Sequence, residues 1–382
     1  MSKTSDAGRL AIWSITMGII SLGFELIDRA SSLVATDMQV FLAGSSRLLV
    51  HKPVFVQGFV SPPAFAVLLI PLTKLPYPIA YGIFIGIGVV SLSLAVWLFA
   101  QALGFNRPLA VIAVLLSPMG WWGLMLGQPD AIITACLLGI AFCLWQKHWF
   151  WAGILTPWLW LKPDLTWPVV FCLGYLLLSH RAILWNYLKG LGISSIAFLA
   201  LGGWLLPAWG LSLLHYGGHT PFRPLLSGLP DLLGGEMSLV SLHHIFVAPF
   251  TMPIIAVGII SMMFALYFVP RRIPDLNAKL VWGISLPLAF WLAVSPYIHA
   301  EDELLALPLV MLLLYRTPQE LPKLMIFFSL LPFVIFPIWG ALAAIPTFLL
   351  ALVSLWRIAS ANPQLRPVGD NHNITPLPLE PQ

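Results

Sequence analysis

The chain has 382 residues, of which 59% are hydrophobic and only 9% are charged, and its formal net charge is +4. This composition, with a mean hydropathy of +0.91, excludes a soluble domain of this length and predicts a membrane protein. The basic residues are scattered over short loops, which argues against nucleic-acid binding, and the three cysteines lie in apolar runs without a disulfide or zinc spacing.

Continuous apolar stretches follow one another along almost the whole chain. A membrane-spanning helix needs roughly 20 apolar residues to cross a hydrocarbon core of about 30 Å, and continuous runs favour helices over the alternating strands of a barrel. We predict an all-α, polytopic transmembrane helix bundle with about twelve spans and one short re-entrant or interfacial segment, forming a single domain over residues 1–360. The predicted segments are 10–27, 62–76, 78–101, 108–125, 130–145, 149–162, 165–179, 189–208, 249–269, 280–296, 303–315, 323–340 and 341–357.

The segment 62–76 decides the predicted topology. It is short, opens with two prolines and ends at Pro76, so we interpret it as re-entrant or interfacial. Both termini are then cytoplasmic, most of the lysines and arginines lie inside, and most of the acids lie outside. In this topology the long loops 28–61 and 209–248 lie outside, and the Pro-rich tail 361–382 is a disordered cytoplasmic segment.

Asp37 is the first candidate functional residue, and it opens an amphipathic run that ends at Arg47 just beyond the first predicted span. A partly desolvated carboxylate at the membrane surface can act as a general base. The same position also suits the cap of a short interfacial helix, and the two roles can coexist.

Two further motifs lie at predicted helix ends. In Gly127-Gln128-Pro129-Asp130, Gln128 and Asp130 are polar groups that either cap a helix or contact a substrate. In Lys162-Pro163-Asp164, the lysine either binds a lipid phosphate, extends from the helix end toward water, or pairs with Asp164.

The densest polar cluster is 295–303, where Tyr297 and His299 precede three consecutive acids. A metal site is one reading, but the chain has no Asp-x-Asp pair of the kind that binds a nucleotide-sugar metal, and the wall of a polar cavity is favoured. Walker, Rossmann and serine-hydrolase motifs are also absent from the sequence. We therefore predict neither a metal nor a cofactor.

The order of these motifs resembles the GT-C-fold glycosyltransferases, and specifically the bacterial polytopic polyprenyl-phosphate-mannose-dependent alpha-mannosyltransferases, over roughly residues 10 to 315. Family members have Asp-aromatic-x-Val-Tyr-Tyr where this chain has residues 37–42, a run of Asp-Met-Gln-Val-Phe-Leu. They have Tyr-Pro-Pro where it has Ser61-Pro62-Pro63, and Gly-Gln-x-Asn where it has Gly-Gln-Pro-Asp at 127–130.

The resemblance implies the transfer of a hexose, mannose in the family, from a polyprenyl phosphate to a glycolipid or polysaccharide at the outer face of the cell membrane. It implies an inverting reaction with Asp37 as the general base. The substrate-binding residues that it implies are Lys162, Gln128, Arg47, Asp130, His299, Tyr297 and Arg223. Lys162 is the main candidate for stabilising the leaving phosphate.

Two other functions fit a polytopic chain of this composition: a transporter or flippase for a lipid or polyol, and a non-catalytic membrane subunit of an envelope assembly. The absence of clear internal repeats and of ionisable residues in the middle of spans weakens the transporter reading. The transferase prediction requires that Asp37 and Lys162, although 125 positions apart in their numbering (162 − 37), meet around one cleft on the outer side.

Overall fold

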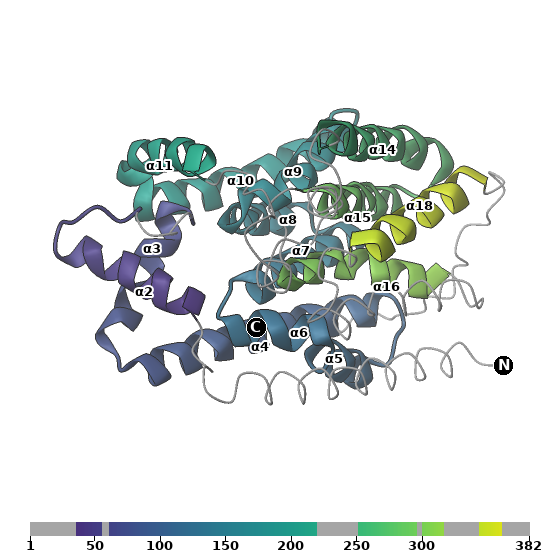
Figure 1. The fold of residues 1–382 in the computed structure, drawn as a ribbon. Helices are drawn as coiled ribbons and strands as arrows, with labels where there is room; N and C mark the ends of the chain where they lie inside the picture. The colour runs from purple at the N-terminus through teal and green to yellow at the C-terminus, as the bar shows by residue number, and fades with distance from the viewer. Residues whose placement is uncertain (1–35, 56–60, 220–250, 296–299, 317–343, 361–382) are drawn as a thin grey trace, which may run out of the picture.

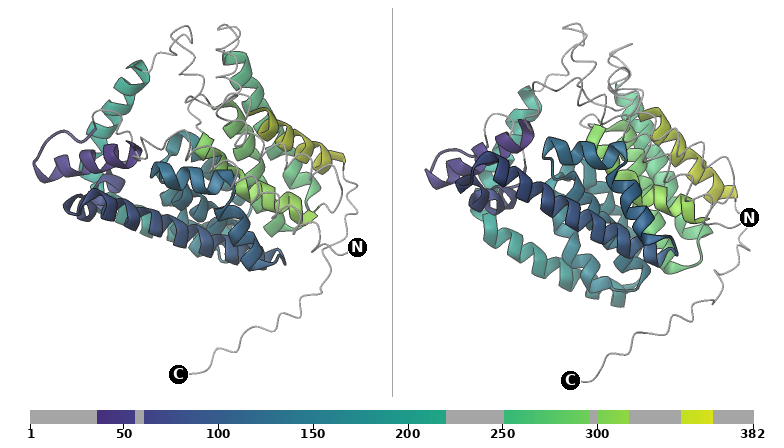
Figure 2. Two further views of the ribbon diagram at one scale, coloured as in Figure 1. Left: turned by 60° about the horizontal axis from the view of Figure 1, so that its bottom comes forward. Right: turned by 90° about the horizontal axis from the view of Figure 1, so that it is seen from below.

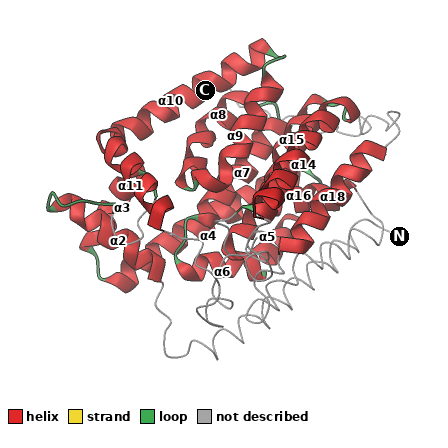
Figure 3. Cartoon of the chain, turned by 45° about the horizontal axis from the view of Figure 1, so that its top comes forward, coloured by secondary structure: helices red, strands yellow, loops and turns green. Residues whose placement is uncertain are grey.

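The computed structural model describes residues 36–55, 61–219, 251–295, 300–316 and 344–360, and these residues form helices joined by turns, without a β-strand among them (Figures 1 and 3). The all-α prediction is confirmed for this part of the chain. The predicted segments 10–27 and 323–340, the tail 361–382 and most of the loop 209–248 lie outside the described residues.

Four helical stretches in the described ranges are long and apolar enough to cross a membrane: Tyr77–Ala102, Arg181–Ser212, Ile255–Arg272 and Leu276–Val294. The first is α4 (Tyr77–Ala102), whose 26 residues extend about 39 Å at 1.5 Å per residue, more than the hydrocarbon core of about 30 Å. One face of α4, with Ile83, Ile87 and Val90, is exposed, whereas Leu92 and Phe99 are buried. Such a helix has the apolar outer surface of a membrane protein.

The centre of the bundle is formed by α7 (Asp130–Trp145) and α15 (Leu276–Val294), which are buried on nearly every side. Helix α7 packs against α4, α8 (Trp149–Leu155) and α15, and α15 also packs against α9 (Pro163–Leu177), α14 (Thr251–Arg272) and α18 (Ala344–Ser360) (Figure 1). Because neighbouring helices enclose both, neither needs a polar face. Cys136 and Cys143 of α7 and Cys172 of α9 are free and buried, as predicted.

Helix α2 (Thr36–Leu49) and the short α3 (Pro63–Leu69) lie together at one end of α4 in both views of Figure 2. Phe41 of α2 meets Phe65 of α3 edge to face with ring centroids 5.3 Å apart, and Phe65 in turn contacts Phe84 of α4 at 6.1 Å. Met38 is fully buried in the same contact region. This aromatic packing fixes α2, and with it Asp37, against the rest of the bundle.

The predicted segment 62–76 consists of α3 followed by the 3₁₀ helix η1 (Ile70–Lys74). At 1.5 and 2.0 Å per residue, the two together extend about 20 Å, which is less than the hydrocarbon core of about 30 Å. This length supports the re-entrant or interfacial interpretation, which stays a prediction.

The single span predicted over 108–125 is interrupted, so that part of the prediction is wrong. The structure has α5 (Arg107–Leu115) and α6 (Pro118–Leu126), with a break at Ser117, whose hydroxyl accepts a hydrogen bond from the Gly120 amide at 3.1 Å. Pro118 disfavours a helical conformation in the residue before it and has no amide proton to continue the ladder. The apolar pattern continues across the break, which is why hydropathy alone did not reveal it.

Three other predicted segments also change conformation along their length. The segment 149–162 ends in η2 (Thr156–Leu161), and 303–315 begins inside η6 (Ala300–Ala306) and continues as α16 (Leu307–Arg316). After α10 (Arg181–Gly202) and η3 (Gly203–Leu205), the helix α11 (Leu206–His219) enters the predicted loop 209–248. Several of these irregular ends carry the polar residues of the candidate site.

Candidate functional site

A tight reversal at the end of α6 presents Gln128 to the site. Gly127 has a positive φ of 70°, a conformation that costs a residue with a Cβ roughly 1–2 kcal/mol. The Gly127 amide donates to the Leu124 carbonyl at 3.1 Å and the Gln128 amide to the Gly123 carbonyl at 3.3 Å. This pair of bonds is the Schellman arrangement that closes a helix C-terminus. The backbone of Gln128 is therefore fixed from the α6 side.

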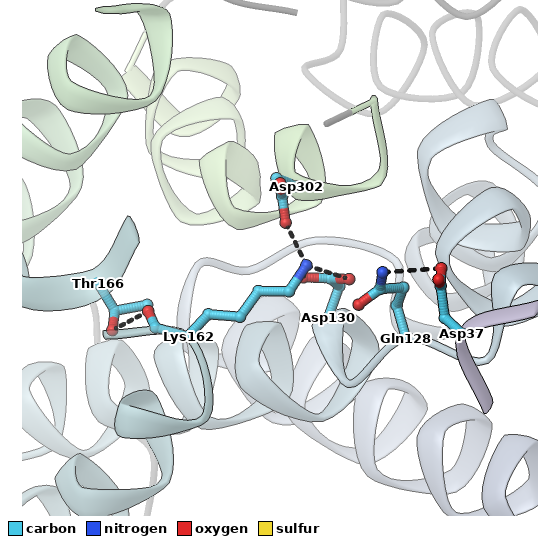
Figure 4. A network of polar contacts seen from close by, with 6 residues as sticks. All are labelled: Asp37, Gln128, Asp130, Lys162, Thr166 and Asp302. Carbon is cyan, nitrogen blue, oxygen red and sulfur yellow. Dashed lines mark hydrogen bonds and ion pairs between the residues drawn. The ribbon is translucent and has the colours of Figure 1, made fainter. Parts of the chain in front are cut away.

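The side chain of Gln128 reaches the candidate base. Its amide Nε2 donates a hydrogen bond of 2.9 Å to Oδ2 of Asp37, which lies in the first turn of α2 (Figure 4). Both side chains are partly buried. A carboxylate that receives one amide hydrogen bond is oriented while it still has an oxygen with which to accept a proton.

Lys162 lies at the corner between η2 and α9, and local bonds hold that corner. The Thr166 hydroxyl lies 2.6 Å from the Leu159 carbonyl oxygen and 2.9 Å from that of Lys162, so its proton can be donated to either of them. Pro163 begins α9, where a missing amide proton costs nothing. The lysine side chain therefore leaves from a well-defined point (Figure 4).

The Lys162 ammonium lies between two buried carboxylates. Its Nζ is 2.9 Å from Oδ1 and 3.0 Å from Oδ2 of Asp130, and it donates a 2.6 Å hydrogen bond to Oδ1 of Asp302 (Figure 4). The Asp130 and Asp302 side chains are 0% and 1% exposed, against 15% for Lys162. We call these three residues the lysine cluster. It connects the start of α7, the corner before α9, and η6.

The formal charge of the lysine cluster with both carboxylates ionised is −1, from two carboxylates and one ammonium. Ion pairs in a poorly solvated site are favourable only when their geometry compensates for the lost hydration. Here the single ammonium is within hydrogen-bonding distance of both carboxylates. Its positive charge is thus already balanced inside the protein, and this arrangement favours a role in holding the site together.

The structure brings together four of the eight predicted site residues: Asp37, Gln128, Asp130 and Lys162, which follow one another in Figure 4. Arg47 is not part of this group, because it lies at the other end of α2, where its Nη1 donates to the Pro53 carbonyl at 3.4 Å. Tyr297, His299 and Arg223 lie outside the described residues.

Asp302 is the residue that sequence reasoning missed as a partner of the lysine. Its run of three acids was recognised as a polar cluster, but nothing in the local pattern indicates which acid points inward. The available signal was general: a lysine in such an apolar chain needs an acidic partner. It did not specify a residue 140 positions away in the sequence. In the described ranges, no group of three or more His, Cys, Asp or Glu side chains is placed to hold a metal ion.

The structure also has an apolar pocket of about 230 Å³, whose lining includes Trp160 but not Lys162, Asp130, Gln128 or Asp37. Its lining comes from the start of α3, from η2, and from α10 to α11, and includes Pro63, Trp160 and Phe198. Ser195 supplies the one hydroxyl among the described side chains of this lining. The pocket therefore suits an apolar ligand chain.

Comparison with known proteins identifies the family. The model of glycosyltransferase family 87 matches residues 59–315, about two thirds of the chain. The match includes Gln128, Asp130, Lys162 and Asp302, and it begins after Asp37. No curated protein and no solved structure gives a significant match to the chain. The match supports a membrane glycosyltransferase over the predicted transporter and non-catalytic subunit. The chain belongs to glycosyltransferase family 87.

Proposed function

We propose that the protein transfers a hexose, mannose in our proposal, from a polyprenyl phosphate to a hydroxyl group of a glycolipid or polysaccharide at the outer face of the membrane. Asp37 takes the proton of the acceptor hydroxyl as its oxygen attacks the anomeric carbon of the sugar. The bond from that carbon to the phosphate oxygen breaks, and the polyprenyl phosphate leaves with the bonding electron pair. Attack from the side opposite the leaving group inverts the anomeric configuration.

The observation that carries this proposal is the hydrogen bond between Gln128 and Asp37. It joins two motifs that lie 91 positions apart, one of them inside the family match and the other before it. An oriented, partly buried carboxylate is what a general base requires, because its lone pair must be directed at one proton. The pairing supports Asp37 and Gln128 as parts of one site.

The apolar pocket supports a lipid-linked donor. We propose that the polyprenyl chain occupies the pocket lined by Trp160 and that its phosphate lies toward the corner of Lys162, which follows Trp160 by two residues in the sequence. We propose Gln128, Arg223, His299 and Tyr297 as phosphate and sugar ligands, with Arg47 as a peripheral one. We propose positioning roles for Lys162 and Asp130 in place of direct substrate binding, because the Lys162 ammonium is already paired with two buried carboxylates.

We further propose that the chain crosses the membrane about twelve times, with both termini in the cytoplasm and the site on the outer side. The short α3–η1 segment supports a re-entrant or interfacial element at this point. An exposed residue at its end, Lys74, offers a test. A Lys74→Cys variant should react with a membrane-impermeant maleimide added from outside. Labelling from the cytoplasmic side alone contradicts the topology.

Transfer from a radiolabelled polyprenyl-phosphate mannose tests the function directly. Membranes with the wild-type protein should form a new mannosidic bond, and Asp37→Asn should lower the rate by about 10²- to 10⁴-fold, since that is the usual contribution of a general base. Asp275→Asn is the matched control, because Asp275 is an exposed helix cap that accepts from the Ala278 amide, a role that asparagine performs as well.

Three results of this experiment would change the conclusion. An unchanged rate with Asp37→Asn removes Asp37 as the base. Faster transfer from a glucose or arabinose donor would show that mannose is not the transferred sugar. Movement of the labelled lipid across the membrane without a new glycosidic bond supports a transporter.

A further inference from the structure

We propose that Asp302 is a positioning residue that acts through Lys162, Asp130 and Gln128 to orient the Asp37 carboxylate. The inference rests on the proposed function, because it takes Asp37 to be the base. In the structure, contacts join Asp302 to Lys162 and Lys162 to Asp130, and a separate hydrogen bond joins Gln128 to Asp37 (Figure 4). Asp130 and Gln128 are connected through the backbone of Pro129. Asp302 stands at the end of this line of residues opposite Asp37.

The first step is the contact between Asp302 and Lys162. At 2.6 Å it is the shorter of the two hydrogen bonds that the ammonium donates to the cluster's carboxylates, and Asp302 is completely buried. Charge-assisted bonds in poorly solvated surroundings are strong and directional. A lysine side chain has four rotatable bonds and does not hold its ammonium in one position by itself. A rigid acidic partner is needed to set the position of its Nζ.

The second step runs from Lys162 to Asp130. The ammonium lies almost equally far from the two oxygens of Asp130, at 2.9 and 3.0 Å. Asp130 is the first residue of α7, and Pro129 links it to Gln128 with a restricted backbone. The Schellman closure of α6 fixes the other side of Gln128. Because the backbone between the two residues is restricted, a displacement of Asp130 also displaces Gln128.

The third step is the hydrogen bond from Gln128 to Asp37. In our proposal the influence of Asp302 reaches Asp37 through Lys162, Asp130 and Gln128. These contacts connect three bundle segments to α2, which also packs against α3, η1 and α6 and includes the aromatic contact of Phe41 with Phe65. The acid on η6 thus controls the orientation of the base without contacting it.

Asp302→Asn is a mild way to disturb this line. The asparagine retains an oxygen that can accept from Lys162, while its charge is lost, and Lys162 and Asp130 remain as a neutral pair. We expect kcat to fall about 10- to 100-fold, since small displacements of a catalytic group have effects of this size. The KM values for donor and acceptor should change less than about twofold.

A double-mutant cycle with Gln128→Ala distinguishes positioning from general destabilisation. If Asp302 acts through Gln128, the double variant with Asp302→Asn and Gln128→Ala should be no more than about threefold slower than Gln128→Ala alone. Independent, multiplying losses overturn the inference, and so does a wild-type kcat in Asp302→Asn. Asp275→Asn again serves as the control and should leave kcat at the wild-type value.

If Asp302→Asn is not recovered as a monodisperse protein, Asp302→Glu replaces it in the same cycle, because the longer side chain keeps the charge and shifts the carboxylate. The same two outcomes then decide the inference. The proposed function fails separately: in that case the wild type forms no product, or Asp37→Asn remains active. An inactive Asp37→Asn together with additive Asp302 and Gln128 effects rejects only the positioning inference.

Discussion

The two polar contacts of the candidate site differ in burial and charge. The Asp37–Gln128 contact is partly buried, contains one formal charge and consists of one hydrogen bond of 2.9 Å. The lysine cluster contains three formal charges, its two carboxylates are at most 1% exposed, and its ammonium is 2.6 to 3.0 Å from them. The first contact leaves the Asp37 carboxylate partly accessible, whereas the second encloses the carboxylates of Asp130 and Asp302 and joins three segments of the chain.

This difference teaches that the two contacts serve separate purposes. A base must exchange a proton with a substrate, so it can be held by only part of its hydrogen-bonding capacity. A buried ion cluster does not need access, and breaking it leaves an unpaired charge in a poorly solvated place. Substitution of Asp37 should therefore lower activity with little loss of stability, whereas substitution of Lys162 should lower stability.

The largest expected effect on stability comes from Lys162→Met, which removes the ammonium shared by the two buried carboxylates. We expect the free energy of unfolding to fall by about 3–5 kcal/mol, as is usual when one partner of a buried pair is removed. Asp37→Asn should change it by less than about 1 kcal/mol. Denaturation of the purified proteins in mixed micelles measures both values. Equal losses in the two variants would contradict the comparison.

Gln128→Ala comes next and affects activity more than stability. It leaves the Asp37 carboxylate without the hydrogen bond that orients it. The expected fall in kcat/KM is about 10- to 100-fold, measured with the labelled donor, since small displacements of a catalytic group have effects of this size. Gln101→Ala is the matched control, since Gln101 makes an exposed contact of 3.3 Å with Arg107. A fall of similar size in that control would remove the special role of Gln128.

Gly127→Ala sharpens the comparison by straining the turn that presents Gln128. The positive φ of 70° should make the variant less stable by about 1–2 kcal/mol. Gly104→Ala is matched to it, because Gly104 has a φ of 73° and open space around it, in the turn between α4 and α5. Both variants should melt earlier, but only Gly127→Ala should slow transfer. Slower transfer in both would point to stability as the cause.

The smallest expected effect is that of Tyr81→Phe. The Tyr81 hydroxyl donates a 2.6 Å hydrogen bond to the Met125 carbonyl and so ties α4 to the last turn of α6. Its loss should lower the free energy of unfolding by about 0.5–1.5 kcal/mol, with transfer slowed less than about threefold. A larger loss of transfer than that seen with Gln128→Ala would show that the support of the turn matters more than the amide.

Local features of the sequence were sufficient for the fold class and for part of the site. Continuous apolar runs predict membrane helices because each span must satisfy its own backbone and match a fixed thickness. The prolines around residues 62–76 predicted a short segment there. Asp37, Gln128, Asp130 and Lys162 were selected from motifs that resemble a known family, and the structure places these four in one line.

Tertiary structure alone decided which charges meet. Lys162 pairs with acids that lie 32 and 140 positions away, and one of them, Asp302, stands in a run of three similar residues. The break at Ser117 is different, because Pro118 is a local signal for it and only the hydropathy, which is apolar on both sides, conceals it. Hydropathy and propensity are properties of a short window of the chain, whereas the partner of a buried charge is chosen by how distant helices pack.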